Sequence, residues 1–295
     1  MKLSYVILTA SRKDELRRCL QSILAQDRPP DEIVVVDNGS TDGTPAMLAT
    51  DFPMCRVVAL STNTGVCAGR NAGLRAAPGD VLVTIDDDCI LEQHDFNRRL
   101  LERFATRPRM GVLALNVATP YNPAAPDPFP SLDKRLRNSE AEVSYFLGGA
   151  VAFRKEIFQQ VGYYPEEYFY AMEELDLSYR LMETNWQIWF APDLIVTHLE
   201  SPRERPPWRR IYFDYRNRIW LGVKYLPLPY LVVNLSVWGL IFFLRAVRYG
   251  YIMHFLRSIR DGVWGAGRYW RNRRQTVLSP RAIQRIKRLK GRLIY

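Results

Sequence analysis

Short apolar runs alternate with segments of helical spacing over residues 3–86 of the chain. Val, Ile and Leu dominate four runs, which we expect to be β-strands: 3–9, 32–37, 56–60 and 81–85. Between the first two runs, Leu16, Leu20 and Ile23 recur at helical spacing, and 65–77 is typical of a helix with small residues. Strands without polar alternation are buried on both faces, so the pattern predicts an α/β fold with a parallel sheet covered by helices.

Polar residues stand at the carboxyl ends of three predicted strands. Thr9 and Ser11 follow the first strand, and Asp37 and Asn38 end the second. Asp86–Asp88 close the fourth. Sheets of this kind bind ligands beyond the carboxyl ends of their strands, so these side chains predict one shared crevice.

The run Asp86-Asp87-Asp88 is the first acidic cluster. Three exposed carboxylates in a turn would be one interpretation. At the end of a buried strand, however, adjacent like charges repel unless a cation or a hydrogen-bond donor compensates them. Asp86 and Asp88 point the same way in an extended segment, and carboxylate oxygens suit Mg²⁺ or Mn²⁺ bound to a diphosphate.

The second acidic cluster is Glu173-Glu174-Leu175-Asp176, in a stretch predicted to be helical over 170–185. Glu173 and Asp176 would share a helix face, and either a solvated helix start or an i,i+4 ion pair between Asp176 and Arg180 would explain the charges. A general base also requires such a carboxylate near the reacting hydroxyl. Strands are expected at 187–192 and 194–198, and His198 ends the second.

The net charge of +10 hides a division of the chain into an acidic and a basic part. Residues 1–200 hold 20 Lys and Arg against 28 Asp and Glu, whereas 201–295 hold 21 against 3. This division excludes a uniformly basic protein and predicts two domains, 1–205 and 206–295. The four dispersed cysteines suit a reducing compartment, and the N-terminus shows no signal-peptide pattern, so we expect it to begin in the cytosol.

The basic part contains 20 residues without a charge, Tyr225–Leu244. Pro227 and Pro229 favour a helix that begins only after Pro229, and hence an interfacial or partly inserted helix over one that spans the bilayer. Arginines and aromatic residues interleave after it, which is typical of a surface that binds anionic lipids. We expect peripheral or partly inserted membrane binding through residues 206–275. Nucleic acid is not the expected partner, because it has no use for the apolar run.

Ten segments together match the motif order of a known family. They are Val6–Arg12, Gln26, Ile33–Gly43, Asn63–Gly65, Gly69–Gly73, Ile85–Asp88, Phe146–Arg154, Gly162, Glu173–Leu177 and His198. Over roughly residues 3–200 the chain resembles family 2 glycosyltransferases, and most of all rhamnosyltransferase-like enzymes of polysaccharide and lipopolysaccharide assembly. The resemblance implies the GT-A fold, a Rossmann-like, mostly parallel sheet with flanking helices, here followed by a helical, membrane-associating extension.

The resemblance further implies an inverting transfer from a nucleotide-diphosphate sugar to a hydroxyl of a glycan or lipid-linked acceptor, assisted by Mg²⁺ or Mn²⁺, in cell-surface polysaccharide assembly. Glu174 would be the general base, with Glu173 and Asp176 as alternatives. Asp88, Asp86 and His198 would hold the metal. The nucleotide and donor sugar would be bound by Thr9, Ser11, Arg12, Asp37, Asn38, Gly65, Arg70, Asn71, Asp86, Asp87, Gly148 and Gly149.

Other functions fit less of the sequence. A dinucleotide-binding domain would have a GxGxxG turn after its first strand, whereas Gly65, Gly69 and Gly73 are spaced GxxxGxxxG. A protein that keeps the fold and binds sugar nucleotides or nucleic acid without turnover is the alternative that stays open. The expected location is the cytoplasmic face of a membrane.

Overall fold

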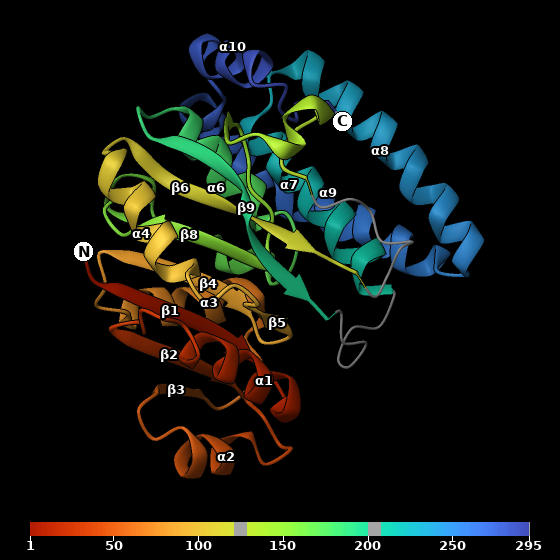
Figure 1. Cartoon of the computed structure of the whole chain (residues 1–295). Coiled ribbons are helices and arrows are strands. Elements are labelled where there is room, and N and C mark those ends of the chain that lie inside the picture. Colours follow the sequence, from red (N-terminus) through yellow and green to blue (C-terminus); the bar gives the residue numbers. More distant parts are fainter. Residues whose placement is uncertain (121–128, 200–207, 295) are drawn as a thin grey trace.

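Figure 1 shows the computed structural model of the chain, which describes residues 1–120, 129–199 and 208–294. One nine-stranded sheet has the order β3-β2-β1-β4-β8-β6-β9-β5, with β7 paired to β9. Its strands are β1 (Leu3–Thr9), β2 (Glu32–Asn38), β3 (Arg56–Leu60), β4 (Val81–Asp86), β5 (Cys89–Ile90), β6 (Met110–Ala118), β7 (Ala141–Val143), β8 (Ala150–Arg154) and β9 (Gln187–His198). The first four agree with the predicted strands to within one residue.

The sheet is mixed, which corrects the expectation of a mostly parallel one. β1 pairs in parallel with β2 and β4, β2 with β3, and β6 with β9. β8 lies antiparallel between β4 and β6, and β5 and β7 run antiparallel to β9. The strand–helix alternation that predicts parallel pairing is confined to the first four strands, so it carried no information on the second half.

Helices cover both faces of the sheet and form two apolar cores. The helices on one face are α1 (Lys13–Leu24), α2 (Thr44–Asp51) and α4 (Phe96–Thr106). The helices before residue 200 on the other face are α3 (Gly65–Ala76), α5 (Ile157–Val161) and α6 (Glu173–Met182). Both cores draw residues from strands β1, β4 and β6, because successive side chains on a strand point to opposite faces.

Strand β9 is continuous, although two separate strands were expected. Its pairing with β6 jumps from Leu115 opposite Ala191 to Asn116 opposite Ile195. The intervening residues bulge out of the ladder, and Asn116 Nδ2 donates to the carbonyl oxygen of Pro192 at 2.7 Å. A bulge accommodates Pro192 without ending the strand, because the proline lacks a ladder N–H.

The C-terminal part is helical and packs on the sheet domain. Its elements are the π-helical turn η3 (Arg210–Asp214) and helices α7 (Tyr215–Tyr225), α8 (Leu228–Tyr249), α9 (Ile252–Thr276) and α10 (Pro280–Arg288). Ile219 and Trp220 of α7 and Ile286 of α10 are buried in the same core as residues of α3 and α6. The boundary expected at 205/206 lies outside the described residues, and the helices that follow it share a core with the part that precedes it.

Helix α8 begins before Pro229, contrary to the expectation that it starts after this proline. Proline is tolerated in the first helical turn, whose N–H groups have no acceptors within the helix. Among the described helices, only α8 is long and apolar enough to cross a membrane, by length and composition alone. Only 22% of its apolar stretch is buried, and Figure 1 shows α8 at the outer edge of the molecule.

Candidate active site

The acidic end of β4 is held by two arginines. Arg12 Nη1 lies 2.7 Å from Asp87 Oδ1, and Arg12 Nη2 lies 2.6 Å from Asp88 Oδ2. Asp86 Oδ1 accepts from Arg70 Nη2 at 2.6 Å. All but Asp86 are buried, and burial raises the pKa of Asp87 to about 7 despite the Arg12 contact. The guanidinium groups therefore supply part of the positive charge that three adjacent carboxylates require.

Asp88 and His198 form the core of a possible metal site. Pairing of β5 with β9 places His198 Nε2 3.1 Å from Asp88 Oδ1. Ligand atoms of Asp88, Cys89 and His198 all lie within 4.8 Å of one another. Burial raises the pKa of the Cys89 thiol well above its usual value, and a soft sulfur ligand suits Mg²⁺ and Mn²⁺ less well than a carboxylate oxygen does. A carboxylate with an imidazole fits Mg²⁺ or, better, Mn²⁺.

Arg70 connects this acidic cluster to the second one. Its Nη1 lies 3.4 Å from Glu173 Oε1 and 3.8 Å from Glu174 Oε1. The Glu173 side chain is only 3% exposed, whereas that of Glu174 is 20% exposed. Gly148 lies against the Glu174 carboxylate so closely that a Cβ atom there would collide with Oε1. Of the two carboxylates, Glu174 is therefore the more accessible to a ligand.

Burial raises the pKa of both glutamates. It raises the pKa of Glu173 to about 8, with the negative charge of Glu174 as the next cause. It also raises the pKa of Glu174, which the neighbouring Arg70 opposes. A carboxylate with a raised pKa is a stronger base, which is the property that a group accepting a hydroxyl proton needs.

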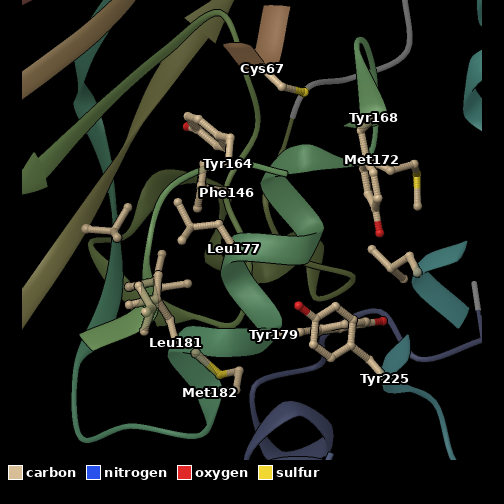
Figure 2. Packing of buried hydrophobic residues seen from close by; sticks show 14 of the residues in the cluster. Cys67, Phe146, Tyr164, Tyr168, Met172, Leu177, Tyr179, Leu181, Met182 and Tyr225 are labelled. Atoms are coloured by element: carbon tan, nitrogen blue, oxygen red, sulfur yellow. The ribbon is translucent and has the colours of Figure 1, made fainter. Parts of the chain in front are cut away.

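The loop that precedes α6 has a strained backbone. Phe169, Ala171 and Met172 have φ angles of 63°, 69° and 71°, a region that residues other than glycine rarely adopt. Asn217 of α7 holds this loop, because its Nδ2 donates to the carbonyl oxygens of Tyr168, Tyr170 and Ala171 at 2.7–3.0 Å. Figure 2 shows Tyr168 and Met172 beside the start of α6. The C-terminal helices thus fix the position of Glu173 and Glu174.

Gly65 contacts the same strained loop from the other side. It has φ +86°, and a Cβ atom there would collide with Phe169. Val66 N donates to Phe169 O at 2.6 Å. The structure therefore gives Gly65 a role in the close approach of this loop, while a direct contact to the donor stays a prediction.

Asp176 lies in a buried ion-pair cluster. Its carboxylate is fully buried and accepts from Arg180 Nε and Lys224 Nζ, both at 2.9 Å, and from Tyr225 OH at 3.1 Å. Arg180 and Lys224 hold its pKa below the usual value despite burial. This geometry favours the i,i+4 ion pair over a catalytic role, and it connects α6 to α7.

Asp176→Asn is expected to destabilise the fold by about 3 kcal/mol, because it leaves the partly buried Arg180 and Lys224 with reduced countercharge. The stabilisation comes from a carboxylate with a lowered pKa, so it is present above the ordinary aspartate pKa and is lost as the pH falls below it. Thermal melting at pH 7 and at about pH 2.5, which lies below the ordinary aspartate pKa, measures both effects. A variant of unchanged stability that loses only sugar transfer would instead return Asp176 to the catalytic candidates.

The residues expected to bind the nucleotide fall into two groups. Thr9, Ser11 and Asp37 lie where β1 and β2 end. In the turn after β2, Thr41 N donates to Ser11 Oγ at 3.1 Å, and Ser40 N donates to Asp37 Oδ1 at 3.0 Å. Backbone conformation is unusual there, since Ser11 has φ 53°. These three residues are brought together, as predicted.

The side-chain amides of Asn38 and Asn71 make hydrogen bonds to other residues of the protein. Asn38 Oδ1 accepts from Thr64 N at 2.9 Å, and its Nδ2 donates to Gly65 O at 3.3 Å. Asn71 exchanges hydrogen bonds with the Tyr164 backbone at 2.9 and 3.0 Å and is fully buried. Both amides stabilise loops beside the crevice. Immediately before β8, Gly149 adopts φ +87°, and its carbonyl oxygen accepts from Asp86 N at 2.7 Å.

Sequence reasoning did not find the contribution of η3 and α7. Asn217, Asp214 and Arg218 lie on these elements beside the second acidic cluster, but the surrounding arginines were assigned only to membrane binding. The signal was present as the polar run Arg216-Asn217-Arg218 at the start of an otherwise apolar helix, where buried polar groups require partners.

The mixed sheet with helices on both faces, the acidic strand end and the glutamates of α6 define a glycosyltransferase fold of the GT-A type. The model of glycosyl transferase family 2 matches residues 4–162, so the chain belongs to this family. Its fold and sequence are those of a glycosyltransferase.

Relatives of known description agree with this class. The chain is 29% identical over 231 residues to N-acetylglucosaminyl-diphospho-decaprenol L-rhamnosyltransferase of Mycobacterium tuberculosis, covering 66% of this chain and 75% of that protein. It is 38% identical over 101 residues to the succinoglycan biosynthesis protein ExoO of Rhizobium meliloti, covering 34% of this chain and 29% of that protein. The first relative is named for transfer of rhamnose, and the second is named for the biosynthesis of succinoglycan.

Solved structures share the fold. S. aureus TarS 1-349 in complex with UDP-GlcNAc aligns with a TM-score of 0.60 and 21% identity, covering 76% of this chain and 66% of that one. The mannosyltransferase PcManGT of Pyrobaculum calidifontis, in complex with GDP-Man and Mn²⁺, aligns with a TM-score of 0.57 and 17% identity, covering 99% and 85%. The chain thus spans about two thirds of the TarS fragment and most of PcManGT.

Proposed function

We propose that this protein is an inverting glycosyltransferase that moves a sugar from a nucleotide-diphosphate sugar to a hydroxyl of a glycan or lipid-linked acceptor in cell-surface polysaccharide assembly. One observation carries the proposal. Arg70 contacts both Asp86, at the end where the donor is expected, and Glu174, the accessible carboxylate on the opposite side. The relatives support the same reaction class, and one of them is named for a lipid-linked diphospho-sugar acceptor.

The reaction follows from this arrangement. Glu174 accepts the proton of the acceptor hydroxyl as that oxygen attacks the anomeric carbon from the face opposite the diphosphate. The bond between the anomeric carbon and the phosphate oxygen breaks, and its electron pair leaves with the nucleoside diphosphate. Attack from the opposite face inverts the anomeric configuration.

Asp88 and His198, with Asp86 beside them, are the residues that would hold a divalent ion. Such an ion would supply positive charge that stabilises the leaving diphosphate. Arg12 donates a hydrogen bond to the second oxygen of Asp88 and so keeps this carboxylate oriented. The imidazole ligand and the Mn²⁺ complex of PcManGT favour manganese over magnesium.

A screen of nucleotide sugars with the purified full-length protein tests the proposal. We expect slow release of nucleoside diphosphate from one or a few donors, dependent on Mn²⁺ or Mg²⁺ and accelerated by a suitable acceptor. Metal-dependent binding of nucleotide sugars without any turnover would instead support the non-catalytic alternative. Salt-sensitive binding of oligonucleotides would favour a nucleic-acid partner.

We also propose that the protein binds the cytoplasmic face of a membrane through α8 and α9. Their exposed apolar side chains, here called the α8–α9 apolar surface, are Leu228, Val232, Val233, Leu240, Phe243, Leu244, Val247, Ile252, Met253, Leu256, Val263, Trp264 and Trp270. On α8, Val233, Leu240, Leu244 and Val247 recur along one helix face, opposite the face that packs on α7. Many exposed apolar side chains on two neighbouring helices favour an interaction site over a solvent-facing surface.

Exposed arginines support a lipid surface as the partner. Arg245 and Arg248 follow the apolar stretch of α8, and Arg257, Arg260 and Arg271 lie on α9. Trp264 is 88% exposed, and a tryptophan at the boundary of headgroups and acyl chains is a common membrane anchor. Apolar and basic groups on the same two helices fit an interfacial position at anionic lipids.

The double substitution of Leu240 and Leu244 by Asp is expected to weaken binding to phosphatidylglycerol vesicles by about tenfold or more, because each leucine contributes roughly 1.5–3 kcal/mol when buried in lipid. Flotation with vesicles measures the bound fraction. The matched control carries Leu24→Asp and Met54→Asp, two exposed apolar residues remote in the fold from α8 and α9. Equal binding of both double variants would contradict the proposed surface.

A further inference from the structure

Arg218 is a buried cation with few partners. It lies on α7 with 7% of its surface exposed. Among the residues that the structure describes, its Nε has no hydrogen-bond partner, and its Nη2 bonds only to the thioether sulfur of Met172, at 3.7 Å. One face of the guanidinium lies over the Trp238 ring, 3.9 Å from the centroid. A guanidinium has five N–H donors, so most of the hydrogen-bonding capacity of Arg218 is not used within the described residues.

A carboxylate lies one helical turn before Arg218 and compensates its charge only in part. Asp214, in η3, acts on the Arg218 charge but makes no hydrogen bond or ion pair with any residue that the structure describes. Arg210, Arg218, Arg245 and Arg292 are all close enough to act on the charge of Asp214. Positive charge therefore exceeds negative charge at this position. Burial of a guanidinium that is compensated only in part is costly, and burial lowers the pKa of Arg218 to about 10.

The location of Arg218 connects two parts of the proposed enzyme. Met172 immediately precedes Glu173 and Glu174, so the guanidinium lies at the start of the helix that carries the proposed base. Trp238 belongs to α8, the helix that carries much of the α8–α9 apolar surface. Arg70, in contrast, contacts Asp86, on the side where the donor is expected to bind. A ligand at Arg218 would therefore lie between the base and the lipid-facing helices.

We propose that Arg218 and the neighbouring arginines of η3 and α8 form a subsite for the phosphate of a lipid-linked acceptor, with Asp214 placed to accept a hydrogen bond from a hydroxyl of the attached sugar. A planar guanidinium binds phosphate through two parallel hydrogen bonds, which matches the free donors of Arg218. This inference rests on the proposed function. It adds to it that the acceptor is phosphorylated and that its phosphate binds apart from the donor diphosphate.

Titration calorimetry with the full-length protein separates the two sources of phosphate. Farnesyl diphosphate is the probe for the acceptor, and UDP, dTDP and GDP with Mn²⁺ are the probes for the donor. Arg218→Met keeps an apolar side chain over Trp238 and removes the charge. We expect it to weaken farnesyl diphosphate binding by about tenfold or more and to change nucleotide binding by less than about twofold.

Two further variants make the result specific. Arg98→Met removes an exposed arginine of α4, on the other face of the sheet, and is expected to leave both affinities within about twofold of the parent protein. Arg218→Lys keeps the charge but loses the planar fork, so it should weaken farnesyl diphosphate binding by an intermediate factor, and it replaces Arg218→Met if melting shows that the latter does not fold.

Two outcomes would overturn the subsite. One is unchanged farnesyl diphosphate binding in both Arg218 variants, and the other is a loss of nucleotide binding, which would assign Arg218 to the donor diphosphate. Failure of the proposed function is distinguishable from both, because it would appear as a parent protein that binds no nucleoside diphosphate with any metal.

Discussion

Glu174→Gln is expected to lower the rate of sugar transfer by about 10²–10⁴-fold and to leave donor affinity within a few-fold, because it removes the proton acceptor and keeps the shape of the side chain. The carboxylate lies beside Arg70 and is the more exposed of the two glutamates. Burial raises its pKa. A base works only when deprotonated, so transfer should fall as the pH is lowered through this raised pKa, at a higher pH than for an ordinary glutamate.

The matched control is Glu173→Gln, which makes the same chemical change one residue earlier. The Glu173 side chain is 3% exposed, so we expect this variant to lose less than about tenfold in rate. Burial and then the charge of Glu174 raise the pKa of Glu173 to about 8, so Glu173 is already protonated in the acid limb, and Glu173→Gln should leave that limb nearly unchanged. A larger loss in Glu173→Gln than in Glu174→Gln would assign the base to residue 173. Rates and donor affinities come from initial-rate assays and calorimetry.

Asp88→Asn is expected to abolish the metal dependence of donor binding. The parent protein should bind its nucleotide sugar at least about tenfold more tightly with Mn²⁺ than with a chelator, and the variant should show a ratio near one. The reason is that Asp88 is the buried carboxylate that faces His198, and an amide oxygen is a much weaker ligand. Calorimetric titration with and without Mn²⁺ gives the ratio directly.

Asp87→Asn is the control for loss of charge beside Arg12. Asp87 contacts the same guanidinium at 2.7 Å but does not face His198. We expect this variant to retain the difference between Mn²⁺ and chelator. Should both variants retain it, the metal would lie elsewhere; should both lose it, the ion pairs with Arg12 would be the more important feature of this site.

The first half of the fold was predictable because its signals are local. Each predicted strand from β1 to β4 is a continuous apolar run, and the acidic residues at the end of β4 are adjacent in sequence. The continuity of β9 was not predictable, since Pro192 usually ends a strand and the bulge that accommodates it is set by pairing with β6. Long-range pairing of this kind leaves no local pattern.

The candidate site was predictable in its residue types more than in its contacts. A sequence shows that Asn38 and Asn71 are amides beside a crevice, but not that their hydrogen bonds are used by loops of the protein itself. The contribution of α7 depends on contacts such as that between Asn217 and Ala171, which are 46 residues apart. The basic, aromatic composition of the C-terminal part therefore indicated a surface property and concealed its part in the active site.

The hydrogen bonds from Asn217 to the loop before α6 bear on how far the proposed base lies from the proposed membrane surface. The same helix that holds this loop also packs on α8 and α9, so α7 connects the proposed base to the α8–α9 apolar surface. If that surface binds a bilayer as proposed, Glu174 would stand at a set height above the lipid headgroups. Only a hydroxyl presented at that height would then be glycosylated, so the protein would select the position of sugar addition along a lipid-borne glycan by distance from the membrane.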